Sequence, residues 1–166
     1  MEIENFYKAA NAYCEWAEGA ASSPELEVVE ALKHLTTLYR LALSLPDVYG
    51  EEDAPEILEL DERRVARRFS QFPFQLYVVC FNPLELEEKP VVGAMSDDLS
   101  DIWRDLRGGV DLYRLGHVSA AAWHWRFHFL LHWGQHVVAA SAALHAWLAE
   151  NPGALPSNNS LQARRP

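Results

Sequence analysis

The sequence predicts an all-α protein, a single-domain helical bundle of about five helices around a buried C-terminal helix at residues 119–149. Three observations predict this fold. Apolar residues recur at helical spacing along most of the chain, and clear start and stop signals divide it into helices. Residues 119–149 are apolar on every side, which is typical of a buried helix. With 166 residues, 49% of them hydrophobic, the chain can bury such a core in one domain.

Two helices are expected before residue 45. The first runs from about Ile3 to Ala20, and its apolar face holds Phe6, Ala10, Tyr13 and Ala17. The second runs from about Pro24 to Ser44. Ser23 supplies an N-cap hydroxyl, and Pro24 occupies the first helical position, where no backbone N–H is needed. The inward face of the second helix is expected to hold Leu32, Leu35, Leu38, Tyr39 and Ala42.

The middle of the chain alternates loops with shorter elements. Residues 46–60 are acidic and proline-containing and are expected to form a solvated loop. A third helix starts near Asp61, and its four arginines are expected to pair with the acidic loop or to stay in water. Residues 74–82, FQLYVVCFN, fit either a strand or a buried helix; we favour a helix because no partner strand is visible. Residues 83–95 are expected to be a loop.

The last two helices carry most of the polar residues of interest. The fourth starts at Ser96, with acids in its first turn, and ends at Gly116. Within it, Gly108-Gly109 marks either a kink or the close approach of a neighbouring element. The fifth starts at Ser119 and runs to about Glu150. The helical-bundle domain therefore covers residues 1–150, and residues 151–166 are expected to be a disordered tail.

The stretch WHWRFHFLLHWGQH, residues 123–136, places four histidines four residues apart: His124, His128, His132 and His136. Histidines at this spacing on a helix can share a metal ion. Each step of four drifts by about 40°, so the four rings spread over roughly 120° and cannot all bind one ion. We expect no cofactor except a candidate divalent metal at His132 and His136. The alternatives are a polar pocket without metal, or core histidines bonded to carboxylates or carbonyls.

Acidic side chains are expected to face this stretch from the fourth helix. Asp98, Asp101 and Asp105 are three and four residues apart and border the apolar stripe of that helix. A buried arginine at position 126 would need acidic partners, since it cannot lose its proton. The sequence therefore predicts a buried polar network with six members: Asp98, Asp101, Asp105, Arg126, His132 and His136.

Two segments resemble a known family. DDLSDIWRDLRGGVDLYRLG followed by WHWRFHFLLHWGQHVVAASAALH is similar to an uncharacterised bacterial family of all-helical proteins, described only as a domain of unknown function. LTTLYRLALSLP fits its earlier half, and the likeness covers most of residues 5–149. The resemblance implies an α-helical fold and no particular activity. His124 and His128 are not part of the family's pattern. The residues that match it are Asp97, Asp98, Asp101, Asp105, Trp125, Arg126, Phe127, His132, Trp133, Gly134, His136 and His145.

Composition limits the function classes. A net charge of −10 argues against a primary nucleic-acid binder, which needs a basic surface. The acids near the N-terminus do not suit a secretory signal, and the histidines of residues 119–149 do not suit a membrane span. Cys14 and Cys80 are expected to be buried free thiols, as in a cytoplasmic protein.

Two functions stay open at the level of sequence, and the oligomeric state is not determined. The first is a non-enzymatic interaction or scaffold protein with a protein partner. The alternative is a metal-dependent or acid–base enzyme that uses His132 and His136 together with Asp98, Asp101 and Asp105.

Overall fold

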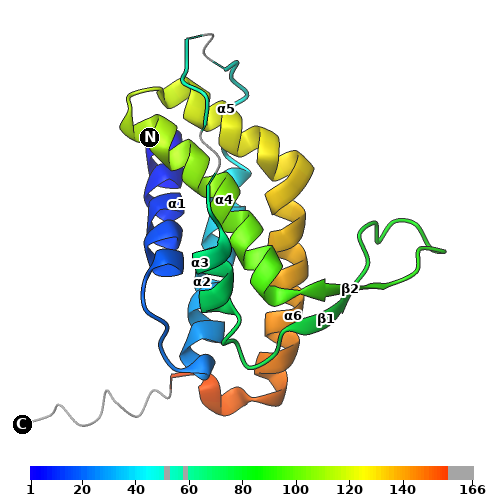
Figure 1. Cartoon of the computed structure of the whole chain (residues 1–166). Helices are drawn as coiled ribbons and strands as arrows, with labels where there is room; N and C mark the ends of the chain where they lie inside the picture. Colours follow the sequence, from blue (N-terminus) through cyan, green and yellow to red (C-terminus); the bar gives the residue numbers. More distant parts are fainter. Residues whose placement is uncertain (51–52, 58–59, 157–166) are drawn as a thin grey trace, which may run out of the picture.

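The structure is a computed structural model that describes residues 1–50, 53–57 and 60–156. Within these residues the chain forms a helical bundle with one small hairpin beside it (Figure 1). The predicted all-α class of about five helices is confirmed, because α5, η1 and α6 together form one long helix. The elements are α1 (Glu2–Glu18), α2 (Pro24–Ala42), α3 (Arg63–Phe69), β1 (Leu76–Val79), β2 (Val91–Ala94), α4 (Met95–Arg114), α5 (Val118–His128), the π-helix η1 (Phe129–Trp133), α6 (Gly134–Glu150) and the 3-10 turn η2 (Pro152–Ala154).

The first two helices form as their sequences predict. The inward residues of α1, Phe6, Ala10, Tyr13 and Ala17, are all fully buried. The backbone N–H of Leu26 donates to the hydroxyl of Ser23, which confirms the N-cap of α2. Amphipathic spacing and local capping therefore suffice to define these two helices.

The centre of the bundle is α4, not the C-terminal helix. Helix α4 packs against α1, α3, α5 and α6, and its apolar stripe of Leu99, Ile102, Leu106 and Val110 is fully buried. The helix starts at Met95, directly after β2, with Ala94 at the N-cap, so the predicted start at Ser96 is one residue late.

The prediction that residues 119–149 are buried on all sides is wrong. Leu130 and Leu131 are 68% and 66% exposed, and Val138 is 54% exposed. Helices α2 and α4 pack against α6, but the described chain leaves these three side chains exposed. Apolar composition shows that a helix can be buried but does not supply elements to cover it.

The C-terminal helix is also interrupted by the π turn η1. A Cβ at position 134 would overlap the carbonyl oxygen of Phe129, five residues earlier, so the glycine there allows the wider turn. A π turn holds more residues than an α turn. It therefore offsets the drift of about 40° per four residues that a regular helix would give the histidines.

Residues 74–82 contain a strand, so the helix favoured from the sequence is wrong. Leu76–Val79 pairs antiparallel with Val91–Ala94, placing Tyr77 opposite Gly93 and Val78 opposite Val92. The partner strand lies within the segment expected to be loop. Paired β-branched residues favour this short hairpin. The two strands are separated by a proline-containing acidic connection, so the sequence carries no short-turn signal for their pairing.

The arginines of α3 do not all stay in water. Arg68 forms an ion pair with Glu27 of α2 at 2.7 Å, and both side chains are more than 90% buried. Its guanidinium also lies 4.6 Å from the ring centroid of Trp16. The pairing expected with the acidic loop is therefore replaced, for Arg68, by a buried link between α2 and α3.

The remaining expectations concern the ends and the surface. Residues 152–154 form η2, which packs on α2 and α6, so this part of the tail is ordered; residues 157–166 lie outside the described chain. Cys14 is buried, whereas Cys80 is exposed, contrary to expectation.

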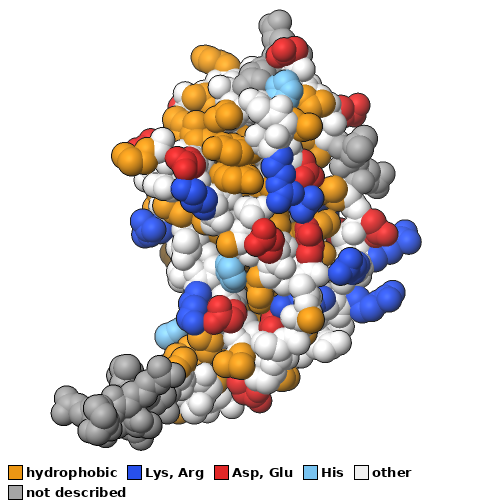
Figure 2. Space-filling view, turned by 90° about the vertical axis from the view of Figure 1, so that its left-hand side faces the viewer, with side chains coloured by type: hydrophobic (Ala, Val, Ile, Leu, Met, Phe, Trp, Pro, Cys, Tyr) orange, Lys and Arg blue, Asp and Glu red, His pale blue; other side chains and the backbone are white. Residues whose placement is uncertain are grey.

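None of the described helices is long and apolar enough to cross a membrane. On the face shown in Figure 2, acidic and basic side chains are interspersed, and hydrophobic side chains gather mainly in its upper half.

Candidate functional site

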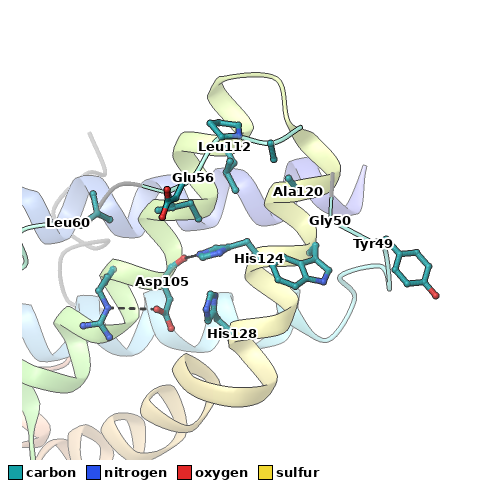
Figure 3. A pocket seen from close by; sticks show the side chains of 14 residues that line it. Tyr49, Gly50, Glu56, Leu60, Asp105, Leu112, Ala120, His124 and His128 are labelled. Carbon is teal, nitrogen blue, oxygen red and sulfur yellow. Dashed lines mark hydrogen bonds and ion pairs between the residues drawn. The ribbon is translucent and has the colours of Figure 1, made fainter. Parts of the chain in front are cut away.

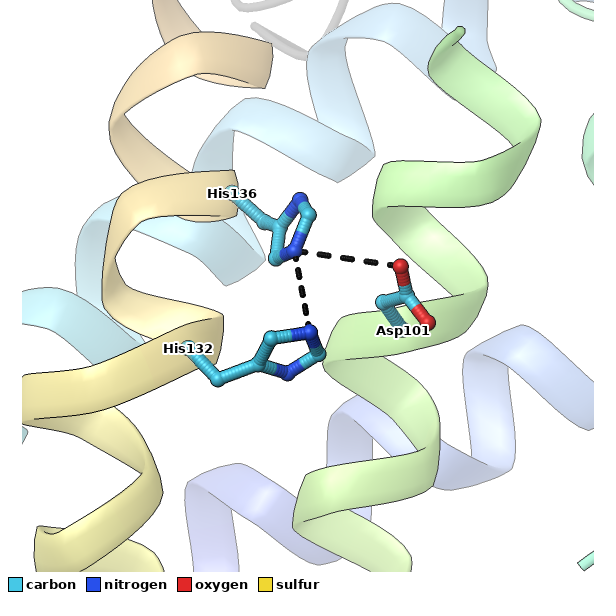
Figure 4. Close-up of side chains that lie close together, drawn as sticks. All are labelled: Asp101, His132 and His136. Carbon is cyan, nitrogen blue, oxygen red and sulfur yellow. Dashed lines mark hydrogen bonds and ion pairs between the residues drawn. The ribbon is translucent and has the colours of Figure 1, made fainter. Parts of the chain in front are cut away.

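The four histidines of the C-terminal helix form two separate groups along α4. His124 and His128, from α5, point toward Asp105 beside a cavity (Figure 3). His132, from η1, and His136, from α6, point toward Asp101 farther along α4 (Figure 4).

His132 and His136 are both held by carboxylates of α4. Nδ1 of His132 lies 2.6 Å from Oδ2 of Asp105, and Nδ1 of His136 lies 2.7 Å from Oδ1 of Asp98. An ionised carboxylate only accepts hydrogen bonds, so Nδ1 of each ring must carry the proton and donate it. In the neutral rings, both Nε2 atoms therefore present a lone pair.

The two Nε2 atoms converge on a third ligand group. They are 3.3 Å apart, and Oδ2 of Asp101 lies 3.8 Å from Nε2 of His136 (Figure 4). Asp101, His132 and His136 thus bring three metal-binding atoms within 4.8 Å of one another. Their side chains are 24%, 36% and 20% exposed, so an ion can reach them from solvent.

Further side chains orient the carboxylates. Arg104 donates to Oδ1 of Asp101 at 2.7 Å and to Glu62 at 2.7 Å. The hydroxyl of Tyr77, in β1, donates to Oδ2 of Asp98. Gly93 lies under the Tyr77 ring, where a Cβ would be 3.1 Å from it. The hairpin therefore places the Tyr77 hydroxyl beside Asp98.

The charges around the two rings are strongly negative. Four carboxylates (Asp98, Asp101, Asp105, Glu62) and the guanidinium of Arg104 leave a formal charge of −3 when both rings are neutral. Burial disfavours a charged His136 ring, but the hydrogen bond and charge of Asp98 outweigh this and raise its pKa above the usual value. The site therefore attracts positive charge.

Comparison with known proteins identifies the family. Residues 1–150 match the protein family described as "Domain of unknown function (DUF5063)". The chain belongs to this family. The DUF5063 fold is also similar to the crystal structure of protein BF1032 from Bacteroides fragilis, with a TM-score of 0.73 and 24% identity over 88% of this chain and 94% of that one. At that identity the similarity concerns the fold alone. Among curated proteins, none matches the chain.

In this DUF5063 protein, Arg126 is not part of the group, so its expected pairing with the aspartates of α4 is wrong. It donates to the carbonyl of Leu45 at 2.8 Å and lies 3.6 Å from Asp47, near the end of α2. Its side chain is 32% exposed, so it does not need a buried counter-charge. The cation beside the aspartates is Arg104, which α4 itself supplies three residues after Asp101.

His124 is bonded to backbone instead of carboxylate. Its Nε2 donates to the carbonyl of Asp105 at 2.9 Å, and the residue is only 8% exposed. Burial, together with the neighbouring His128, lowers the pKa of His124 to about 4. His124 is therefore neutral at physiological pH and structural in character. Nδ1 of His128 is buried and has no hydrogen-bond partner among the described residues.

Sequence reasoning missed three residues of the DUF5063 site: Tyr77, Glu62 and Arg104. Arg104 carries a local signal, because its spacing of three from Asp101 allows an ion pair on one helix. Tyr77 and Glu62 come from elements distant in sequence, and no local pattern marks them.

Proposed function

We propose that the chain binds a divalent metal ion through Nε2 of His132, Nε2 of His136 and a carboxylate oxygen of Asp101. The observation that carries this proposal is the 3.3 Å between two Nε2 atoms that both present lone pairs. A tetrahedral ion with metal–nitrogen bonds of about 2.0–2.1 Å separates two ligand nitrogens by about 3.3 Å. Without a cation between them, a proton shared by the two rings is needed to avoid repulsion.

The orientation of the ligands supports the proposal. Metal-binding histidines usually donate their other ring nitrogen to a carboxylate, which fixes the tautomer and the ring plane. Asp105 and Asp98 do this for His132 and His136, and Arg104 holds the second oxygen of Asp101. The formal charge of −3 around the two neutral rings attracts a dication.

Two imidazoles and one carboxylate suit zinc or ferrous iron. Three protein ligands leave at least one coordination position for water or a substrate, and such an ion acidifies bound water and polarises carbonyl or phosphoryl oxygens. A metal-dependent enzyme is accordingly the activity that this ligand set favours. Asp98, Asp105 and Arg104 would act as positioning residues.

The test is metal binding by untagged protein. We expect about one zinc ion per chain in a competition titration with a chromophoric chelator. His132→Ala and His136→Ala should each lose at least about 100-fold in affinity. His145→Ala is the matched control, because His145 is an exposed histidine of the same helix, and its affinity should equal that of wild type.

Two outcomes would contradict the proposal. One is a wild-type protein that does not compete with the chelator for zinc, iron or manganese. The other is equal affinity in His132→Ala, His136→Ala and His145→Ala, with all three folded by circular dichroism. An Asp105→Asn variant adds a graded test, with an expected loss of about 10–100-fold, because it weakens the orientation of His132 without removing a ligand.

A non-enzymatic interaction protein is the second candidate. The observation that favours it is the exposure of Phe127, Leu130, Leu131 and Val138 on one long helix. If a second copy of the chain binds there, the sedimentation coefficient should rise with concentration in wild type and stay constant in Leu131→Lys. A constant coefficient in wild type would exclude self-association through this surface.

We also propose a cytoplasmic location. Cys14 and Cys80 are both free, and Cys80 is exposed. Exposed free thiols persist in reducing compartments and are oxidised elsewhere. Quantitative alkylation of Cys80 in protein taken directly from intact cells would support this location, and an oxidised Cys80 would oppose it.

A further inference from the structure

A cavity of about 1000 Å³ lies between α4, α5 and residues 49–50, 54–57 and 60 (Figure 3). We propose that this cavity binds an uncharged, flat aromatic molecule. The inference goes beyond metal binding, because none of the three proposed metal ligands, Asp101, His132 and His136, lines the cavity. A volume of this size, lined mainly by apolar side chains with a few polar groups, is typical of small-molecule sites.

The apolar lining has an aromatic wall. The Trp123 ring is 40% exposed and stacks on Phe127 at 5.0 Å with an interplanar angle of 16°. Gly50 lies against the indole, where a Cβ would be 3.6 Å from the ring. Ile57, Leu60 and Leu112 complete the apolar surface. A flat ring system would pack against the exposed part of the indole and against these aliphatic side chains.

Two of the three charged groups of the lining, Arg104 and Asp105, are already engaged, and the third, Glu56, is exposed to solvent. Arg104 is paired with Glu62 and Asp101 at 2.7 Å each. Asp105 accepts from His132 at 2.6 Å. A charged ligand that binds at Arg104 or Asp105 would have to displace one of these partners and leave it without a counter-charge. An uncharged ligand avoids that cost, because it asks only for hydrogen bonds.

Two histidines supply the hydrogen-bonding groups. His124 lines the cavity as a neutral ring whose Nε2 is committed to the carbonyl of Asp105. His128 lines it as well, and its Nδ1 lacks a hydrogen-bond partner among the described residues. Because this nitrogen is buried, a ligand hydroxyl can satisfy it only if the His128 side chain turns toward the cavity. Buried polar groups without partners are rare in folded proteins.

Asp105 connects this cavity with the proposed metal ligands. Its carbonyl accepts from His124, and its carboxylate accepts from His132. The two sites are nevertheless separate, since the cavity lining and the ligand set share no residue. Protein treated with chelator therefore tests the cavity without the metal.

The experiment is isothermal titration calorimetry of the full chain at pH 7, after treatment with chelator. The chain is titrated with three probes of similar shape. 2-Naphthol is neutral, 2-naphthoate is an anion and 2-naphthylmethylammonium is a cation. We expect 2-naphthol to bind at least about tenfold more tightly than either charged probe. Trp123→Ala should weaken 2-naphthol by at least about tenfold, while Trp123→Phe, which keeps an aromatic wall, should retain most of the affinity.

Leu131→Ala is the matched control, because Leu131 is an exposed apolar residue of the same helix outside the cavity. It should bind 2-naphthol as wild type does. The proposal is overturned if 2-naphthol does not bind, if the charged probes bind equally well, or if folded Trp123→Ala and Leu131→Ala bind alike. Zinc binding measured on the same Trp123→Ala protein should be unchanged, which keeps the two proposals distinguishable.

Discussion

The two histidine pairs of the C-terminal helix, His124/His128 and His132/His136, have the same spacing but different hydrogen-bond partners. His124 is buried against the backbone of α4, and its pKa is lowered. His136 lies against a carboxylate of α4, and its pKa is raised. The π turn η1 starts directly after His128 and includes His132. Identical spacing within one helix therefore does not give identical roles.

The difference originates in what α4 presents to each pair. Near His124, α4 has Gly108-Gly109, so α5 approaches closely and Trp125 donates to the carbonyl of Leu106 at 3.0 Å. Near His132 and His136, α4 instead presents aspartate side chains. Beside the glycine pair, the rings of His124 and Trp125 lie close enough to α4 to bond to its backbone carbonyls. Beside the aspartates, the rings of His132 and His136 bond to side-chain carboxylates of α4 instead.

The largest effect is expected from a substitution that prevents the close approach of α4 and α5. A Cβ at position 109 would overlap the buried indole of Trp125. Gly109→Ala should therefore destabilise the protein by about 3 kcal/mol, despite the better helix propensity of alanine. Urea unfolding followed by circular dichroism measures the change. Gly153→Ala is the control, since a Cβ there meets nothing within 4 Å. Equal stability of the two variants would contradict the packing described for α4 and α5.

The second prediction concerns the pH dependence that His124 causes. Its pKa is about 4 in the folded chain and 6.5 in an unperturbed one, so the unfolded chain binds the proton more readily between these values. The stability that a neutral His124 contributes is complete above about pH 6.5 and is lost as the pH falls toward 4. The difference amounts to up to about 3 kcal/mol.

Urea unfolding at several pH values measures this slope. His124→Gln, which keeps a donor for the carbonyl of Asp105, should flatten it, whereas His145→Gln should not. An unchanged slope in His124→Gln would show that other groups control stability in this range.

The sequence predicts the helices and part of the site, and the reasons are physical. The faces of α1 and α2 and the Ser23 cap depend on local spacing, so they are predictable. The three aspartates and His132 with His136 also come together as expected from helical periodicity. Arg126 does not join them: it lies in α5, before the π turn, and donates to the carbonyl of Leu45 instead. Tyr77 was missed with its strand.

The third prediction concerns the π turn η1, which starts after the first histidine pair and includes His132 of the second. A Cβ on residue 134 would overlap the carbonyl oxygen of Phe129. Gly134→Ala should cost about 2 kcal/mol, and it should weaken zinc binding because it shifts His132 relative to His136. Chelator competition and urea unfolding of the same protein measure both effects. A variant with wild-type stability and wild-type zinc affinity would show that the π turn is not needed for either.

The smallest expected effect belongs to His128, and its sign is the informative part. Nδ1 of this ring is buried without a partner among the described residues, whereas the corresponding atoms of His132 and His136 have carboxylates. Replacing an unsatisfied polar group by an apolar one is neutral or stabilising. His128→Leu should therefore change the free energy of unfolding by less than about 1 kcal/mol, toward greater stability, and leave zinc affinity unchanged. His132→Leu should instead abolish zinc binding and destabilise, because Asp105 would lose its partner. If His128→Leu destabilised the protein as much as His132→Leu, the carboxylate partner of His132 would not distinguish the two residues. The difference in role between the two histidine pairs would then be contradicted.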